Sequence, residues 1–103
     1  MNSVIPEHLK STYELIVATF PEEVSVEEYL PLLYLLYADM SERNVAEIVS
    51  KVANVIKLPQ KDYYVILNDL WFIRSEKDSY ATEIEMVKQK LLNNGYAEWL
   101  EMD

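Results

Sequence analysis

A ten-residue apolar run, from residue 29 to residue 38, dominates the pattern of hydrophobic and polar positions along the chain. Apart from Pro31, every residue between Tyr29 and Ala38 is apolar or aromatic. A helix without a polar face is buried on all sides. The run is about half as long as a membrane-spanning helix, and no Lys or Arg borders it. It therefore predicts a central helix over residues 31–39, around which other helices pack.

The residues before this run contain a helix start signal. Ser25 and Glu28 have the spacing of a capping box, in which each side chain accepts a hydrogen bond from the other's backbone amide. Pro31 cannot donate to the carbonyl of Glu27, so we expect a short turn over residues 26–29 and a new helix from Pro31. A single kinked helix over residues 26–39 is the alternative.

Four further segments place apolar residues at helical spacing. They predict helices from about Pro6 to Phe20 and over residues 42–56, 61–74 and 80–93. Three of these helices have a clear expected inner face, formed by Ile5, Leu9, Tyr13, Ile16 and Phe20; by Val45, Ile48, Val49, Val52, Val55 and Ile56; and by Tyr80, Ile84, Val87 and Leu91.

The connections between these helices carry their own signals. Ser41 is the expected cap of the helix over residues 42–56. We expect a charged loop from Arg74 to Ser79, and Gly95 in a left-handed conformation as the stop of the last helix. Tyr96 and Trp99 in the tail are expected to fold back onto the bundle.

Composition supports an all-α fold with a single domain over residues 1–103. The chain is half hydrophobic and about a quarter charged, which suits one globular core. It has one Gly and no Cys, which leaves little room for hairpins or phosphate-binding loops and excludes disulfide chemistry. The first residues lack the pattern of a signal peptide, so the expected location is the cytoplasm.

The charge is acidic and uneven. The net charge is −9, and residues 1–50 hold nine acidic and two basic residues, which gives −7, whereas residues 51–103 give −2. An acidic surface repels a phosphate backbone, so nucleic acid is an unlikely partner of the chain as a whole. The charge keeps such a protein soluble.

The helix predicted over residues 61–74 is apolar on two sides. Its inner face is formed by Tyr63, Ile66, Leu67, Leu70 and Ile73, but its far side also carries apolar and aromatic residues. A helix that only covers a core carries charge there. Aromatic residues are also those that anchor protein interfaces. We therefore interpret the chain as a non-enzymatic protein–protein interaction module that binds a protein partner or itself through Tyr64, Val65, Trp71 and Phe72.

A helix-turn-helix regulator is the alternative interpretation. The helices over residues 42–56 and 61–74 are adjacent and joined by a short link, but the link lacks a turn Gly, and few base-reading residues begin the second helix. This hypothesis requires one exposed face that holds the basic residues Lys51, Lys57, Lys61 and Arg74.

The sequence offers little for catalysis. His8 is the only histidine, and no His or Cys cluster with metal-ligand spacing and no glycine-rich nucleotide loop is present. We therefore expect no cofactor, no metal site and no enzymatic activity. A deep pocket that holds His8 together with a carboxylate would be the evidence for an enzyme.

Two short stretches resemble a small bacterial family of helical domains of unknown function, the three-three-four-nine family common in mycobacteria. The resemblance covers about residues 15–99 and rests on Phe20-Pro21, Val24, Glu28-Tyr29-Leu30-Pro31-Leu32-Leu33 and the end pattern Val87, Leu91, Gly95-Tyr96. The chain departs from the family at Glu23, where the family has Gly, and at Ser25, where Pro is usual. The resemblance implies an all-helical domain of about 100 residues and transfers no catalytic residue.

Overall fold

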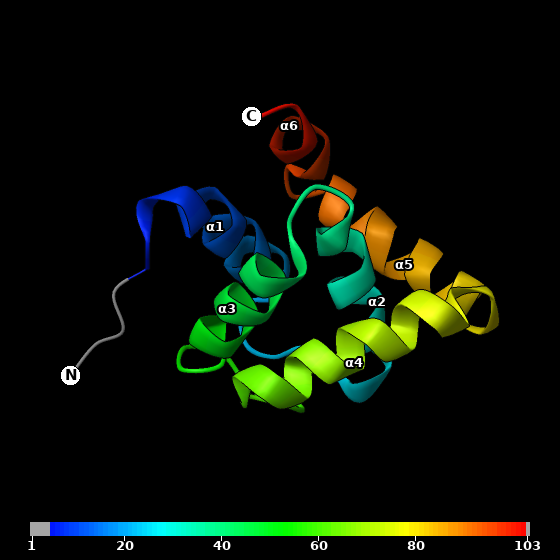
Figure 1. The fold of residues 1–103 in the computed structure, drawn as a ribbon. Coiled ribbons are helices and arrows are strands. Elements are labelled where there is room, and N and C mark those ends of the chain that lie inside the picture. Colours follow the sequence, from blue (N-terminus) through cyan, green and yellow to red (C-terminus); the bar gives the residue numbers. More distant parts are fainter. Residues whose placement is uncertain (1–4, 103) are drawn as a thin grey trace.

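The apolar run lies on α2 (Val26–Tyr37), which packs against α3, α4 and α5 in the middle of the molecule (Figure 1). The computed structural model describes residues 5–102. Leu32, Leu33 and Leu36 are fully buried, and Tyr34 and Tyr37 pack against the core at its margin. The prediction of a buried central helix is confirmed.

Within residues 5–102 the regular structure is helical, apart from one isolated bridge between Glu23 and Lys57. The helices are η1 (Glu7–Leu9), α1 (Lys10–Thr19), α2 (Val26–Tyr37), α3 (Glu42–Val52), α4 (Tyr63–Glu76), η2 (Lys77–Tyr80), α5 (Ala81–Leu92) and α6 (Tyr96–Glu101). One hydrophobic core takes side chains from all six α-helices. The predicted all-α bundle is confirmed.

The expected break at Pro31 is wrong, because α2 continues through the proline from Val26 to Tyr37. The alternative of one helix through this segment is the better prediction. The capping box is present: the Ser25 hydroxyl accepts from the Glu28 amide at 3.2 Å, and the Glu28 carboxylate accepts from the Ser25 amide at 3.0 Å. Pro31 is itself buried, and Glu27 is exposed, so water can hydrogen-bond the carbonyl that Pro31 leaves without a donor.

The helix predicted over residues 42–56 is shorter than expected, because α3 ends at Val52 and residues 53–62 form the connection to α4. Val55 turns outward and is exposed instead of facing the core. The backbone of Lys57 pairs with the segment before α2: its amide donates to Glu22 at 3.0 Å and its carbonyl accepts from Val24 at 2.9 Å. These hydrogen bonds replace those that a longer α3 would make.

The charged loop expected from Arg74 to Ser79 is also wrong. The chain stays helical there, since α4 runs to Glu76 and passes directly into η2. This segment contains no Gly or Pro, so nothing in it stops a helix. At the other end, the Asp62 carboxylate caps α4 by accepting from the amides of Tyr64 and Val65.

The tail folds back as predicted and forms a short helix that the sequence pattern did not indicate. Gly95 has φ 106°, the left-handed value expected of it. The Tyr96 hydroxyl donates to the Leu35 carbonyl at 2.9 Å, and the Trp99 indole donates to the Thr12 hydroxyl at 2.9 Å. Both rings are buried and stack with centroids 5.6 Å apart, so α6 closes the core over α1 and α5.

We expect Leu33→Asp to abolish folding. An unpaired carboxylate in the centre of the core costs an amount comparable with the whole stability of a small domain, about 5–15 kcal/mol. Thermal unfolding followed by circular dichroism is the measurement. Glu22→Gln, at an exposed position, is the control and should change stability by less than about 0.5 kcal/mol. A cooperatively folded Leu33→Asp protein would contradict the central position of α2.

We expect the contribution of the Glu28 carboxylate to depend on pH. Partial burial acts to raise its pKa, but hydrogen bonds from Lys90 and from the Ser25 amide outweigh this and hold the pKa below its ordinary value. The stabilisation is therefore present above the unfolded-state pKa and is lost as pH falls through the lower folded-state pKa. Glu28→Gln should destabilise the protein by up to about 1 kcal/mol at pH 7. A difference that persists unchanged at pH 2.5 would contradict this.

Candidate functional site

The orientation of α4 is set by its inner face. Ile66, Leu70 and Ile73 have helical spacing and are fully buried. The Tyr29 hydroxyl, from α2, donates to the Asp69 carboxylate at 2.7 Å. Burial of Tyr29, together with the nearby Asp69 carboxylate, raises the pKa of this hydroxyl above its ordinary value, so it remains a donor. The opposite side of α4 must therefore face outward.

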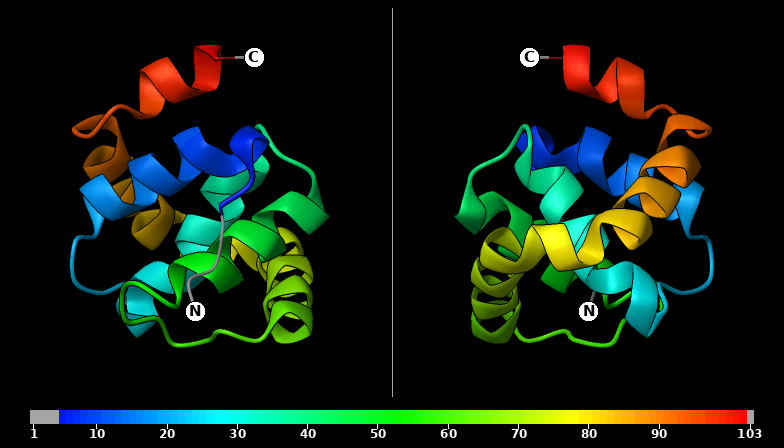
Figure 2. Two further views of the ribbon diagram at one scale, coloured as in Figure 1. Left: turned by 90° about the vertical axis from the view of Figure 1, so that its left-hand side faces the viewer. Right: turned by 90° about the vertical axis from the view of Figure 1, so that its right-hand side faces the viewer.

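Four apolar residues on that outward side form the outer patch: Tyr64, Val65, Trp71 and Phe72. Their exposed fractions are 73%, 39%, 57% and 47%, in that order. A spacing of seven residues is nearly two helical turns, so Tyr64 and Trp71 share one stripe and Val65 and Phe72 share the next. In both views of Figure 2, α4 lies at the periphery of the molecule. These are the residues that the sequence predicted as a contact surface, and they share one exposed face.

Neighbouring rings hold two of the patch residues in place. The ring of Tyr64 meets the ring of Tyr63 edge to face with centroids 5.0 Å apart. Phe72 meets Tyr80, at the end of η2, in the same way at 6.2 Å. Ring pairs of this geometry are favourable. Tyr64 and Phe72 thus each have one aromatic contact within the protein.

Arg74 makes a cation–π contact with Trp71. The guanidinium carbon of Arg74 lies 5.3 Å from the centroid of Trp71 and 4.5 Å from the ring centroid of Tyr37 on α2. The same guanidinium is ion-paired with Glu42 at the start of α3. Beside it is an open cleft of about 990 Å³ between the end of α2, the start of α3 and the end of α4. Arg74 therefore lines this cleft and also contacts Trp71 of the outer patch.

The segment that carries the outer patch is nearly neutral. Residues 61–80 hold four acidic and three basic residues, a net charge of −1, although the whole chain carries −9. Most of the acidic excess lies in residues 1–50. The segment that carries the outer patch therefore contributes little of the net charge of the protein.

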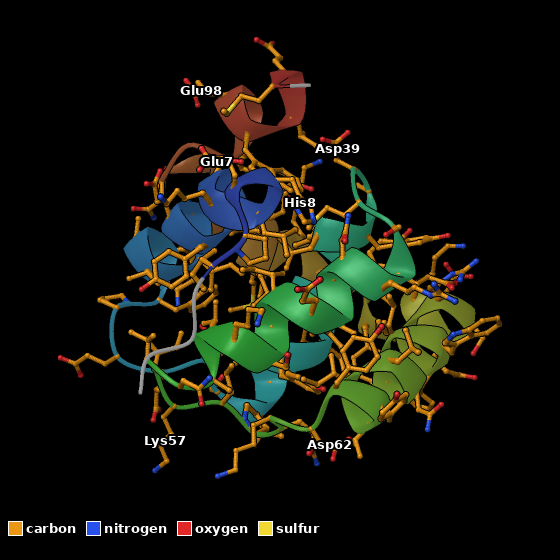
Figure 3. The ribbon with its side chains drawn as sticks, turned by 60° about the vertical axis from the view of Figure 1, so that its left-hand side comes forward. Glu7, His8, Asp39, Lys57, Asp62 and Glu98 are labelled. Carbon is orange, nitrogen blue, oxygen red and sulfur yellow. The ribbon has the colours of Figure 1, made fainter. Side chains whose placement is uncertain are left out.

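The four basic residues of the helix-turn-helix hypothesis are spread over α3, the connection after it and the end of α4. Lys61 precedes the first residue of α4, and Arg74 lies roughly 16 Å further along the helix at 1.5 Å per residue. Lys57 and Asp62 both lie along the lower edge of the molecule in Figure 3, apart from each other. Lys51 is half-buried at the end of α3, and Arg74 is ion-paired with Glu42. The ten residues between α3 and α4 also form a longer connection than the short turn of that motif.

His8 and Asp39 line one hollow of about 310 Å³, which also contains Ser41 (Figure 3). The sequence did not indicate that these residues come together. Both His8 and Asp39 are exposed, and in the described part of the chain no hydrogen bond joins their side chains. The Ser41 hydroxyl caps α3 by accepting from the Asn44 amide at 3.2 Å. The hollow thus places the histidine near a carboxylate without the hydrogen-bonded geometry of an activated nucleophile.

No three His, Cys, Asp or Glu side chains among residues 5–102 are grouped so that they could hold a metal ion. No helix in the same range combines the length and the apolar character that a membrane crossing requires.

No family model, no curated protein and no solved structure matches the chain. The resemblance to the mycobacterial helical family therefore remains an expectation from the short motifs alone.

We expect the two tryptophans to differ sharply in solvent access. Trp71 is exposed on the outer patch, whereas Trp99 is buried against Thr12. Acrylamide should quench most of the Trp71 emission and little of the Trp99 emission in the folded protein. Trp71→Phe should therefore remove most of the quenchable fluorescence while changing stability by about 0.5 kcal/mol or less. Strong quenching that persists in Trp71→Phe would contradict the assignment.

Proposed function

We propose that this protein is a non-enzymatic interaction module that docks onto a protein partner through the outer patch of α4. The observation that carries the proposal is the exposure of Tyr64, Trp71 and Phe72 on one face of a helix whose core contacts come from the opposite face. A partner that buries these rings would remove apolar surface from water. The hydrophobic effect is the main favourable free-energy term in most protein association. The hydrophobic core does not include these three side chains.

The size of the outer patch supports this proposal. Three half-exposed aromatic side chains and one valine present roughly 400 Å² of apolar surface. Contiguous patches of about 300–600 Å² are the largest on typical monomeric proteins and are often functional. Scattered exposed apolar residues such as Val26 and Val55 occur elsewhere, and those need no explanation.

The rigidity of the outer patch supports it as well. Tyr64, Trp71 and Phe72 each contact a neighbouring side chain, namely Tyr63, Arg74 and Tyr80. Side chains that are already ordered lose less conformational entropy when a partner immobilises them. The arrangement resembles the rigid aromatic anchors found at the centre of protein interfaces.

The proposal places the module in the cytoplasm. Its core is built from apolar side chains of all six α-helices and uses no disulfide, since the chain has no cysteine. A chain of about 100 residues buries enough surface to fold without such cross-links.

We expect Trp71→Ala combined with Phe72→Ala to abolish partner capture without unfolding the domain, because both side chains are about half exposed and lie outside the core. The measurement is a pull-down from nuclease-treated lysate, with bound proteins identified by mass spectrometry and tested again as purified proteins. Met86→Ala is the matched control, because Met86 is an exposed apolar residue on α5 outside the outer patch.

The outcomes separate the candidate functions. A partner that binds the wild type and Met86→Ala but not the double variant supports the proposal. Binding that the double variant retains would refute the outer patch as the contact surface. Capture that disappears with nuclease, or that depends on Lys51, Lys57 and Lys61 instead, would favour the nucleic-acid alternative.

A further inference from the structure

The outer patch is symmetric about one residue. Asn68 is exposed and lies between the two stripes of the patch. Tyr64 and Phe72 stand four residues on either side of it, and Val65 and Trp71 stand three residues on either side. A second α4 that runs in the opposite direction across Asn68 would bring Tyr64 and Val65 of one copy to the level of Trp71 and Phe72 of the other. Self-complementarity of this kind is the requirement of a two-fold symmetric interface.

We propose that the occupant of the outer patch is a second copy of this chain, with the two α4 helices antiparallel and a two-fold axis beside Asn68. This inference rests on the proposed function, since it names the partner of the same surface. Facing Asn68 side chains can donate to and accept from each other, because an amide group carries both a donor and an acceptor. The polar centre then needs no other partner.

Charge favours the antiparallel arrangement. Lys61 precedes α4, and Glu76, Lys77 and Asp78, with a net charge of −1, lie at or beyond its other end. In an antiparallel pair, Lys61 of each copy comes to the level of Ser75 and Glu76 of the other, so opposite charges meet at both ends. A parallel pair would place like charges together. The segment over residues 61–80 has a net charge of only −1, so its own charge opposes the association only weakly.

The expected interface is small. Roughly 400 Å² per copy from the patch residues is about half of what a stable interface buries on each partner. The dimer should therefore be weak, with the weight-average mass rising above the 12.1 kDa of one chain only between roughly 10 µM and 1 mM. A reversible association of this strength suits a module that exchanges partners.

A single cysteine can report the two-fold axis directly, because the natural chain has none. Helices pack with axes about 8–10 Å apart, and their Cα atoms lie about 2.3 Å from the axis. Residues that face each other at the axis therefore have Cα atoms about 3.4–5.4 Å apart, a range that overlaps the Cα separations found in disulfides. Asn68→Cys should cross-link two copies, whereas Gln89→Cys, exposed on α5, should not do so preferentially.

The experiment follows disulfide formation on non-reducing gels under mild oxidation, with folding of each variant checked by circular dichroism. We expect Asn68→Cys to dimerise at least about tenfold faster than Gln89→Cys, because the interface raises the local thiol concentration. Adding Trp71→Ala should remove this advantage. Lys61→Glu should slow cross-linking about two- to fivefold, and adding Glu76→Lys should restore it.

Equal rates for the two cysteine variants, or an unchanged rate with Trp71→Ala, would overturn the second copy as the occupant. If Asn68→Cys failed but a purified partner still bound in a Trp71-dependent way, the inference would fail and the proposed function would stand. If neither self-association nor partner binding depended on Trp71, both would fail.

Discussion

The burial of the apolar part of α2, between Tyr29 and Leu36, is the constraint on which the rest of the structure depends. Its sequence offers no polar face, so other helices must supply apolar surface around it. This requirement orients α4, whose Ile66, Leu70 and Ile73 face inward while the Tyr29 hydroxyl holds Asp69. Because one face of α4 satisfies the core, the aromatic residues on its other face are left in solvent. The exposure of the outer patch is thus a consequence of how the core is built.

The chain separates its features along its sequence. Most of the acidic excess lies in residues 1–50, whereas the segment with the outer patch is nearly neutral. Arg74 joins the two regions by pairing with Glu42 and contacting the rings of Tyr37 and Trp71. A basic residue that sequence reasoning could assign to nucleic acid therefore has a structural role beside the apolar surface. A charged residue near aromatic rings is best interpreted only after its neighbours are known.

Hydrophobic periodicity was sufficient to predict the helical fold, the central helix and the two-sided character of α4, because burial sets each of these. It failed where a local rule competes with tertiary packing. The proline rule predicted a break at Pro31, but burial on both sides of the proline holds α2 together. Backbone pairing of Lys57 with Glu22 and Val24 shortened α3, and no sequence period reports such a contact. The position of His8 and Asp39 in one hollow and the contact of Arg74 with Tyr37 depend on long-range geometry, which periodicity does not contain.

The most direct test of the outer patch as a contact surface uses the two indole N–H signals of the ¹⁵N-labelled protein. Trp71 is on the outer patch, and Trp99 is buried with its N–H bonded to Thr12, so each indole reports one environment. As protein or partner concentration rises, a contact through the outer patch should shift and broaden the Trp71 signal while the Trp99 signal stays in place. A Trp71 signal that stays unchanged while Trp99 shifts would contradict it, because binding would then occur away from α4.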